Sequence, residues 1–573
     1  MTQENKFSRR SFVKGGVLAA AVPAVGLGAF YFGYERTLGS PLRVAILGTG
    51  DEGSVLLGAI NPEYVTVKAI ADIRPFNVHR AFHGDVSSPV ALKARCGLMA
   101  KYGWKTEHEA RKHVKVYDDY RALLENEKDI EAVIIGLPLH LHADASIKAM
   151  RKGYHVLCEK LMAHTVGQCK EMARIANDEH KHLAIGHQRH YNILYQEAVD
   201  NIKRGVLGDI HYIRAQWHRN YRPGSDSWQQ PMPQLAKKDD PQARKLINDL
   251  NNAKAELDSA TGREIEATYK RWAQIQAQIN DSILVEGGTL KTGDTYKTAK
   301  DYGYNDAKLF GSYNRPALEE LLRWRLFQRT GAGLMVELGS HQLDAASIFL
   351  TAQQERKVPE FKGQKLHPLS VLVSANRNLF GSDREVADHV TALVEFPSWD
   401  YDASSKVGRK RKIGVQYSTI NGNGFGGYGE IVCGTEGTLV LATEATSEIM
   451  KSGGATSVKA DTAAVALDTQ ASGPAQAAVA SSGAAEVSRG YQEEIEHWAW
   501  CVRVNPKNRD KTLQPRCKPE VALTDAVIAL VTNEAAVKGG KMNFKEEWFD
   551  VKSDETPEGI APDTKKEDFV TKV

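Results

Sequence analysis

The chain has 573 residues, which is too long for one simple core and predicts two large folded units with insertions. Hydrophobic residues make up 42% and charged residues 25% of the sequence, the balance of an ordinary globular protein. The formal net charge is only +3, so no overall field favours nucleic acid or acidic lipid as a partner.

Six cysteines are too few to staple a chain of this length, and none has the spacing of a zinc site. We therefore predict no metal site and expect buried or inert thiols. Cys501 and Cys517 are one pair that an oxidising compartment would allow to bond.

The first forty residues have the character of a targeting segment. Arg9 and Arg10 precede an uncharged run from Gly15 to about Tyr34, which is rich in Ala, Gly and Val. This looks like a twin-arginine signal, the alternative being a chance Arg-Arg pair before a buried helix. The run is about long enough to cross a bilayer, and the nearest cleavage candidate is Val22-Pro23-Ala24. We expect export to the periplasm by the twin-arginine translocase, with removal of the segment favoured over its retention as a membrane anchor.

A dinucleotide motif follows the signal. The apolar run Leu42–Leu47 reads as a buried strand, and Gly48-Thr49-Gly50-Asp51-Glu52-Gly53 comes directly after it, before a helical stretch. Glycines allow a tight turn and a close approach of the backbone to a pyrophosphate at the helix N-terminus. A second strand, Val65–Ala71, ends at Asp72, where a carboxylate can bind the ribose hydroxyls of the adenosine. Arg74 could instead bind a 2′-phosphate, and we prefer NAD to NADP.

Strands continue to alternate with helices, which predicts a parallel, doubly wound sheet. The predicted elements are strand Val114–Tyr117, helix Tyr120–Asn126, strand Glu131–Gly136, helix Ala143–Lys152 and strand His155–Lys160. Ligands of such sheets bind at the carboxyl ends of the strands. Those ends carry Asp72, Pro138, His140, Glu159 and Lys160.

The run Val133–Met162 resembles the stretch ending in Glu-Lys-Pro of the Gfo/Idh/MocA oxidoreductases, with Leu161 in place of the proline. Gly186–Tyr191 resembles that family's entry into its second domain. Gly331–Asp344 resembles the distal segment that often carries an acid and a histidine four residues apart, here Glu337 and His341. The resemblance covers about 41–220 and 320–550. It implies a Rossmann domain over 41–186 and an α+β domain over 187–550 with a large, mostly antiparallel open sheet.

The resemblance also assigns roles. His341 is the expected base, Lys160 the group that bonds the substrate oxygen, and Glu337 a substrate-binding or orienting acid; residues i and i+4 share a helix face, so Glu337 and His341 can point into one site. The expected cofactor contacts are Gly48, Thr49, Gly50, Asp51, Glu52, Gly53, Asp72, Ile73, Arg74, Leu137, Pro138, His140, His142, Glu159, Lys160 and Gln188. The candidates for facing a sugar are Tyr191, Trp217, His218, Trp324 and Arg325.

The distal half is rich in strand signals without a helix between each, which predicts a mostly antiparallel sheet. The runs are Ile210–Trp217, Leu369–Ala375, Val390–Phe396, Ile413–Ile420, Gly429–Cys433 and Thr438–Ala442. The free face of such a sheet predicts a homo-oligomer. Two insertions interrupt the domain: 225–320 is expected to be helical decoration without chemistry of its own, and 450–486 a loop or tether. Arg489–Val502 and Pro519–Lys538 are expected to be helices, and 551–573 a C-terminal tail.

These patterns favour an exported NAD(P)-dependent oxidoreductase that acts on a sugar, polyol or glycoside hydroxyl and holds its cofactor tightly. The first alternative is an NAD-dependent lyase or glycosidase that oxidises its sugar transiently, through a 3-keto sugar. The second is a non-catalytic sugar-binding protein on the same fold.

Overall fold

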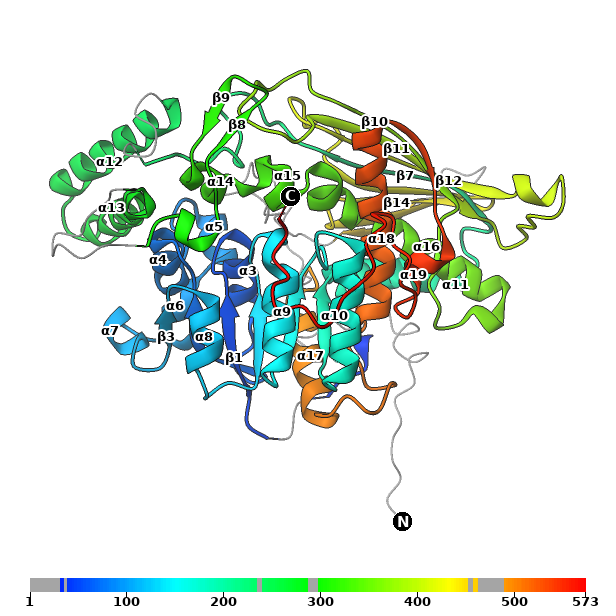
Figure 1. Cartoon of the computed structure of the whole chain (residues 1–573), viewed down its shortest axis with the longest axis horizontal. Helices are drawn as coiled ribbons and strands as arrows, with labels where there is room; N and C mark the ends of the chain where they lie inside the picture. Colours follow the sequence, from blue (N-terminus) through cyan, green and yellow to red (C-terminus); the bar gives the residue numbers. More distant parts are fainter. Residues whose placement is uncertain are drawn as a thin grey trace, which may run out of the picture.

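The computed structural model describes residues 31–35, 39–233, 240–286, 297–451, 457–461 and 489–572. The twin-arginine pair and most of the apolar run after it lie outside the described residues. Two layered units stand one above the other, with the first third of the chain below and a broad sheet above (Figure 1).

The first unit is a six-stranded parallel sheet in the order β3-β2-β1-β4-β5-β6. Its order reverses between β1 and β4, and this crevice lies outside the carboxyl ends of the strands, where doubly wound sheets bind ligands. The strands are β1 (Leu42–Leu47), β2 (Val65–Ala71), β3 (Lys115–Tyr117), β4 (Ala132–Ile135), β5 (His155–Glu159) and β6 (Leu183–Gly186).

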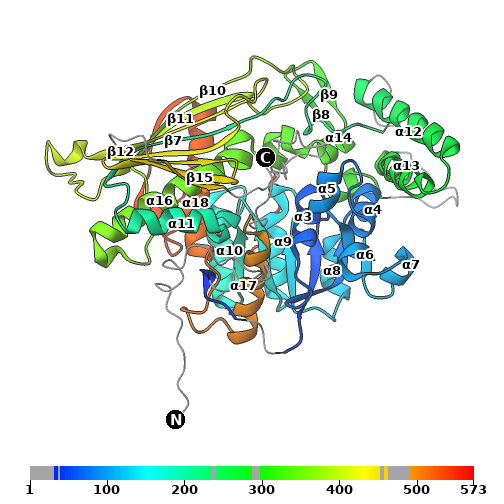
Figure 2. The ribbon, with the colours of Figure 1, turned by 180° about the vertical axis from the view of Figure 1, so that it is seen from behind.

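Helices cover both faces of this sheet. One hydrophobic cluster joins one face to the first group of helices and to the late helix α17, and a second cluster joins the other face to α8, α9 and α10. The first group is α3 (Asp51–Ala59), α4 (Pro75–His83), α5 (Pro89–Ala94), α6 (Gly97–Tyr102) and α7 (Glu107–Ala110), with α17 (Tyr491–Val504). The other helices are α8 (Tyr120–Asn126), α9 (His142–Arg151) and α10 (Val166–Asp178). The last part of the chain thus returns to complete the first unit, as Figure 2 shows for α17.

The second unit is a nine-stranded sheet in the order β16-β15-β14-β13-β7-β12-β11-β10-β17. All pairs are antiparallel except β7 with β12, so the predicted mostly antiparallel sheet is confirmed. The strands are β7 (Ile210–His218), β10 (Ser370–Asn376), β11 (His389–Pro397), β12 (Lys412–Ile420), β13 (Tyr428–Gly434), β14 (Gly437–Ala442), β15 (Thr446–Lys451), β16 (Ser457–Asp461) and β17 (Gly540–Asn543).

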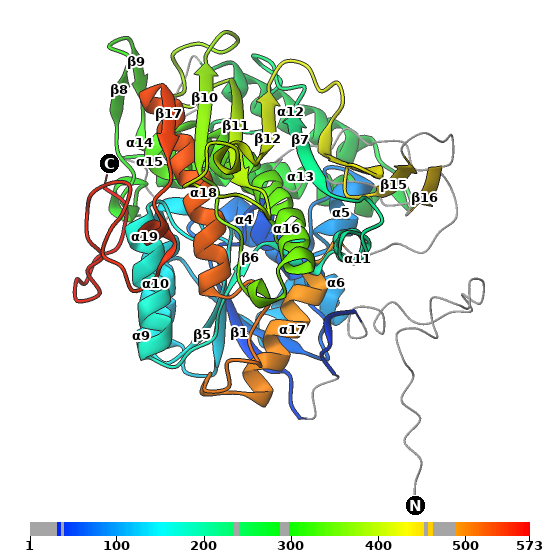
Figure 3. The same ribbon diagram turned by 90° about the vertical axis from the view of Figure 1, so that its right-hand side faces the viewer.

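The inner face of the large sheet packs on long helices, whereas the outer face stays uncovered (Figure 3). These helices are α11 (Ile193–Lys203), α16 (Ser340–Lys357) and α18 (Pro519–Lys538). A π-helical turn, Met335–Gly339, precedes α16. The alternating burial along β11 and β12 is what one buried and one solvated sheet face requires.

The insertion at about 225–320 forms a helical hairpin beside the first unit and a small ribbon at the level of the large sheet (Figure 1). It contains α12 (Pro241–Ser259), α13 (Glu264–Asn280), β8 (Ala307–Leu309), β9 (Tyr313–Arg315) and α14 (Ala317–Leu322), and α15 (Gln328–Gly331) follows. α13 packs against α4, where Gln274 donates to Asp85 at 3.0 Å. This contact places the insertion beside the carboxyl end of β2.

The C-terminal tail is a strap across the first unit, after the short helix α19 (Glu546–Phe549). Lys170 on α10 donates to the carbonyl oxygens of Glu547, Ser553 and Glu555 at 2.7–3.0 Å. Phe569 is buried at 1% exposure, and its N–H donates to Asp144 on α9 at 3.1 Å. The tail is therefore part of the folded unit and not a loose end.

Two expectations need correction. Phe32 and Tyr34, which the sequence assigned to the targeting segment, are buried in the fold, because their rings pack against Tyr191 and Tyr64. Residues 457–461, expected in a loop, form β16 by pairing with the backbone of β15, while 462–488 lie outside the described residues. Cys501 and Cys517 are free, buried thiols, as the expectation of buried or inert thiols has it, and the bond that their pairing would have allowed is not formed.

The described residues contain no helix that is both long and apolar enough to cross a bilayer. The apolar run that raised the possibility of an anchor lies almost wholly outside those residues.

The strap makes a stability prediction. Phe569→Ala removes a buried ring between the tail and α9, so we expect the free energy of unfolding to fall by about 3 kcal/mol, measured by denaturant melting. Phe425→Ala is the matched control, because that ring is 87% exposed and its loss should change stability by less than about 0.5 kcal/mol. Equal stability of the two variants would contradict the tail's structural role.

Candidate functional site

Three glycines meet at the crevice between β1 and β4. A Cβ on Gly48 would lie 2.5 Å from the carbonyl oxygen of Gly136, and one on Gly53 would lie 2.0 Å from the carbonyl oxygen of Gly48. Gly48 also has a φ of +85°, which only glycine adopts readily. These contacts bring the N-terminus of α3 directly over the strand ends.

Gly50 differs from its neighbours in the turn. A Cβ there would meet only the Asn77 side-chain nitrogen, at 3.6 Å, so the protein's own packing does not require a glycine. Gly50 is the N-cap of α3 and offers no side-chain cap, so backbone N–H groups at this end stay available to a ligand.

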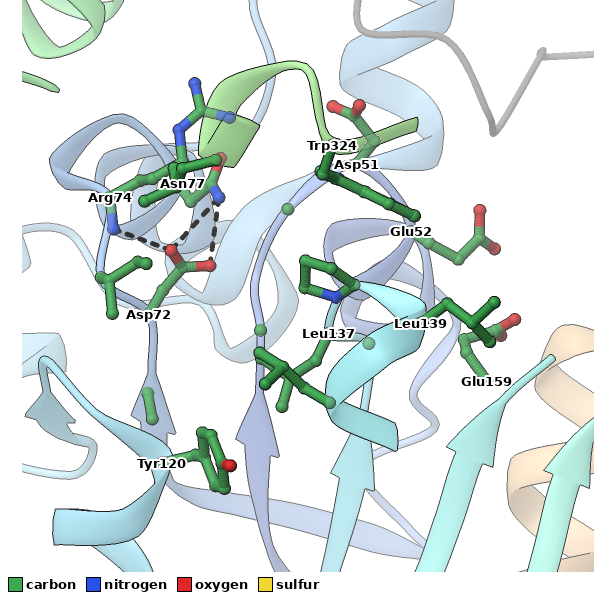
Figure 4. A pocket seen from close by; sticks show the side chains of 18 of the residues that line it. Asp51, Glu52, Asp72, Arg74, Asn77, Tyr120, Leu137, Leu139, Glu159 and Trp324 are labelled. Atoms are coloured by element: carbon green, nitrogen blue, oxygen red, sulfur yellow. Dashed lines mark hydrogen bonds between the residues drawn. The ribbon is translucent and has the colours of Figure 1, made fainter. Parts of the chain in front are cut away.

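Asp72 stands at the end of β2 and is held from several sides. Its carboxylate accepts from the backbone N–H of Thr49 at 2.8 Å and of Arg74 at 2.9 Å, and from the Asn77 amide (Figure 4). Burial nevertheless raises its pKa, while these hydrogen bonds oppose the rise. The carboxylate is thus fixed in position at the edge of the crevice.

A cavity that is partly open to solvent begins at Asp72 and passes over the glycine turn to Lys160. Its walls come from the ends of β1, β2, β4 and β5, from the insertion and from the segment before the π-turn. The predicted residues among its lining are Gly48, Gly50, Asp51, Glu52, Asp72, Ile73, Arg74, Leu137, Pro138, His142, Glu159, Lys160, Trp324, Arg325 and Glu337.

Sequence reasoning missed other lining residues, among them Asn77, Arg80, Asp118, Tyr120, Arg121, Gln230, Tyr302, Tyr304 and Leu321. Asn77 and Arg80 follow Asp72 at helical spacing, which is a signal that could have found them. Gln230, Tyr302 and Tyr304 belong to the insertion. The insertion therefore forms part of the cavity wall, which the expectation of helical decoration over 225–320 did not include. Tyr302 donates to Asp118 at 3.0 Å and closes the wall beside β3.

The side chain of Arg74 is hydrogen-bonded to the insertion. Its guanidinium donates to Asp281 at 3.0 and 2.9 Å and to Gln230 at 3.1 Å. Asp281 is fully buried and accepts a further bond from the N–H of Phe76. Arg74 is therefore committed to the insertion rather than free at the ribose end of the cavity.

Lys160 lies at the opposite end of the cavity and is 7% exposed. Its Nζ donates to the carbonyl oxygen of Glu337 at 2.8 Å, and burial lowers its pKa. The Lys160–Leu161 peptide bond, where the family pattern has a proline, is cis. The ring nitrogens of His142 lie 2.8 Å from the carbonyl oxygens of Leu161 and Leu137, so His142 supports the walls on both sides of this end.

Glu337 and His341 contact different partners. The Glu337 carboxylate accepts from Arg325 at 3.1 Å and lines the cavity. His341 is 3% exposed, its ring centroid lies 5.3 Å from that of Trp217, and it is not part of the lining. Glu337 lies in the π-turn and His341 in α16, so the expectation of one shared pocket holds for Glu337 only. Burial and the nearby Lys160 charge lower the pKa of His341 well below its usual value.

The remaining predicted contacts lie outside the cavity for identifiable reasons. Thr49 turns to Asp72, Gly53 packs on Gly48, and His140 packs edge-on against the ring of Tyr304. Gln188 is buried away from it. Tyr191 bonds His497 in the first unit's core, and His218 lies near the carbonyl oxygen of Phe425 on the sheet. Trp217, Tyr191 and His218 therefore do not line the cavity.

The cavity fits a dinucleotide. Asp72 is placed for ribose hydroxyls, the open space at Gly50 for a pyrophosphate on the N-terminus of α3, and the Pro138–Lys160 end for a reacting ring. The two acids that follow Gly50 are compensated: Asp51 pairs with Arg80 at 3.0 Å, and burial raises the pKa of Glu52.

Comparison with known proteins agrees with this geometry. Residues 42–187 match the model of the oxidoreductase family with the NAD-binding Rossmann fold. Inositol 2-dehydrogenase of Salmonella typhimurium is 30% identical over 122 residues, which are 21% of this chain and 36% of that protein. D-glucoside 3-dehydrogenase of Escherichia coli is 28% identical over 196 residues, 33% of this chain and 46% of that protein. The match thus spans less than half the length of either relative.

A solved structure resembles the chain over a greater length. The inositol dehydrogenase homolog of Azotobacter vinelandii, complexed with NAD⁺, covers 89% of this chain and 99% of its own, with a TM-score of 0.52 and 14% sequence identity. At that identity the likeness establishes the fold of both units. Over residues 42–187 the sequence is similar to the NAD-binding Rossmann fold of that oxidoreductase family.

Substitutions at two glycines of this turn should affect nucleotide binding and protein stability separately. Gly50→Ala should leave the melting temperature nearly unchanged and weaken nucleotide binding by about tenfold or more, measured by calorimetric titration, because its Cβ enters only the ligand's space. Gly53→Ala should instead lower the melting temperature by about 5 °C or more, because its Cβ meets backbone. The interpretation fails if Gly50→Ala binds NAD like the unaltered protein.

Proposed function

We propose that this protein is an NAD-dependent oxidoreductase of the Gfo/Idh/MocA family that oxidises or reduces a hydroxyl carbon of a sugar, polyol or glycoside. The single observation that carries the proposal is the continuous cavity from Asp72 over Gly50 to Lys160. It supports one extended ligand with a ribose at one end and a reacting ring at the other. The dehydrogenases of inositol and of glucosides among its relatives support the substrate class.

Bound NAD would supply the hydride acceptor and donor at the Lys160 end of the cavity. The residues of this chain then have to bind the substrate oxygen and move its proton. Lys160 donates a hydrogen bond to that oxygen, and its charge stabilises the alkoxide that develops as the proton leaves. Lys160 and Glu159 are both buried, which limits the contact of these groups with bulk water.

His341 is the proposed proton acceptor. Its lowered pKa keeps the ring unprotonated at neutral pH, which is the form that can accept a proton. His341 does not line the cavity that ends at Lys160, so this role requires its ring to reach the substrate hydroxyl once cofactor and substrate are bound. Glu337 holds Arg325 and offers its carbonyl oxygen to Lys160, so its part is to orient the other two groups.

We also propose that the cofactor is held through many turnovers. Residues of the insertion line the proposed adenosine end of the cavity, and Trp324 lies over the glycine turn (Figure 4). A cofactor enclosed in this way leaves only if these segments move, and it is then recycled by a second substrate. Such retention suits export by the twin-arginine route, which, like the homo-oligomer, stays a prediction.

The commitment of Arg74 to Asp281 supports NAD over NADP. Asp72 occupies the ribose end with a negative charge that would repel a 2′-phosphate. The arginine that could compensate for it is bonded elsewhere.

The catalytic proposal predicts two separable losses. Lys160→Met and His341→Ala should each lower turnover of inositols or glucosides by about 10² or more while nucleotide binding is kept. Lys362→Ala and His211→Ala are the matched controls, because both side chains are exposed, and these variants should keep normal turnover. Turnover is measured with the purified full chain as product formation by mass spectrometry, since a retained cofactor gives no free NADH signal.

The same assay distinguishes the alternatives. If the sugar is cleaved and the redox state of the cofactor shows no net change, the protein is an enzyme that oxidises its substrate transiently and not a dehydrogenase. Normal activity of both variants would exclude Lys160 and His341 from the chemistry, and sugar binding without any product would favour a binding protein.

The cofactor proposal has its own test. Denaturing the purified protein should release about one NAD per chain and no NADP. Asp281→Ala should raise the affinity for NADP by about tenfold, because Arg74 is released toward the ribose end. The double variant Asp281→Ala with Arg74→Ala should lose that gain. An unchanged NADP affinity in a folded Asp281→Ala protein would contradict the role given to this ion pair.

A further inference from the structure

A second cluster of reactive side chains lies behind His341, away from the cavity. It joins His187 and His190 at the entry to the second unit, Asp344 on α16, and Cys517 and Asp525 at α18. Ligand atoms of His187, Asp344 and Asp525 lie within 4.8 Å of one another, as do those of His190, Cys517 and Asp525. The two groups share Asp525 and so form one site.

Several polar atoms in this cluster have no hydrogen-bond partner among the described residues. Both ring nitrogens of His187 and the Oδ2 atoms of Asp344 and Asp525 are buried and have no hydrogen-bond partner within the part of the chain that the structure describes. His187 and Asp344 are each 1% exposed, and Asp525 is 2% exposed. Buried polar groups are rarely left without a partner, so four such atoms facing one another require an explanation.

Lys365 accounts for the other two carboxylate oxygens. Its Nζ donates to Oδ1 of Asp344 at 2.8 Å and to Oδ1 of Asp525 at 2.5 Å. Each aspartate therefore has one oxygen fixed by an ammonium group and the other directed at the histidines. A cation that holds the outer oxygens of carboxylate ligands is typical of the second shell of a metal site.

One separation within the cluster is that expected of two zinc ligands, and a second is slightly longer. Nδ1 of His187 lies 3.5 Å from Oδ2 of Asp344, and Nε2 of His190 lies 3.8 Å from Oδ2 of Asp525. These are long for hydrogen bonds. Two ligands that each lie about 2.0–2.2 Å from a tetrahedral zinc ion are separated by roughly 3.3–3.6 Å.

We propose that His187, Asp344 and Asp525, completed by His190 and Cys517, bind one Zn²⁺ ion. Nitrogen, carboxylate and thiolate ligands are the set that zinc prefers, and no more than five of them surround it here. The dication and Lys365 together balance the charges of two carboxylates and a Cys517 thiolate. None of the five residues lines the cofactor cavity, so the ion is structural and fastens the entry of the second unit to α16 and α18.

The competing arrangement is a network of ion pairs without a metal. In it a protonated His190, 3.1 Å from Oδ1 of Asp344, and Lys365 neutralise the two aspartates. That arrangement offers His187 and the Oδ2 atoms of both aspartates only the long contacts of 3.5 and 3.8 Å and no hydrogen bond. The two arrangements differ in metal content, which decides between them.

The test is metal analysis of the full chain after loading with Zn²⁺ and gel filtration. We expect about one zinc ion per chain by mass spectrometry, and a fall in melting temperature when a strong chelator removes it. His187→Gln and Asp525→Asn should each lower the zinc content by about half or more while far-ultraviolet circular dichroism stays unchanged. His83→Gln is the matched control, since His83 also pairs with an acid, Glu107 at 2.9 Å, and should keep the zinc.

Replacement of zinc by Co²⁺ tests the thiolate separately. A thiolate-to-cobalt absorption band is expected in the unaltered protein and should be lost in Cys517→Ser. Folded protein that holds less than about 0.1 zinc per chain after loading, with a melting temperature unaffected by chelator, would overturn the proposal in favour of the ion-pair network.

Discussion

The close contact of Gly48, Gly53 and Gly136 is the constraint on which the site depends. Without side chains, β1, the turn after β4 and the N-terminus of α3 approach to distances that any Cβ would forbid. That approach fixes where backbone N–H groups point and where the crevice opens. The positions of Asp72 and Lys160 follow, because they stand at the ends of strands whose register the parallel sheet sets.

One buried charge pair attaches the insertion to this frame. Arg74 of the first unit pairs with Asp281 of the insertion, whereas Arg80 and Arg95 hold Asp85 within the first unit, where Gln274 of the insertion donates to it. A buried pair adds little to stability compared with a hydrophobic contact, but breaking it leaves an unpaired charge. The Arg74–Asp281 pair therefore favours one docked position of the insertion over alternatives, which the proposed cofactor site requires.

The fold was predictable where the signal is local. The strand–glycine–helix run at Leu42–Ala59 and the alternating strands after Asp209 carry their own periodicity, and α18 was predicted at its observed bounds. The cavity wall from the insertion was not predictable, because Gln230, Asp281 and Tyr304 acquire their role only through contacts with Arg74 and His140 far away in sequence. The cluster at His187 and Asp525 escaped for the same reason: its members are widely separated and form no spaced motif.

The acids at the start of α3 show why a motif alone does not describe a site. The glycine pattern predicts an anion at this helix end, yet Asp51 and Glu52 would place negative charge there. The partners of the two acids resolve this conflict. Arg80 pairs with Asp51, and Arg325 lies 3.7 Å from the Asp51 carboxylate. Burial raises the pKa of Glu52, which favours the neutral form of that carboxyl group. Arg325 comes from the segment that covers the turn and also bonds Glu337 at the reacting end. One arginine thus connects the acid that follows the glycine turn to Glu337 beside Lys160, so the two ends of the cavity share a charged group.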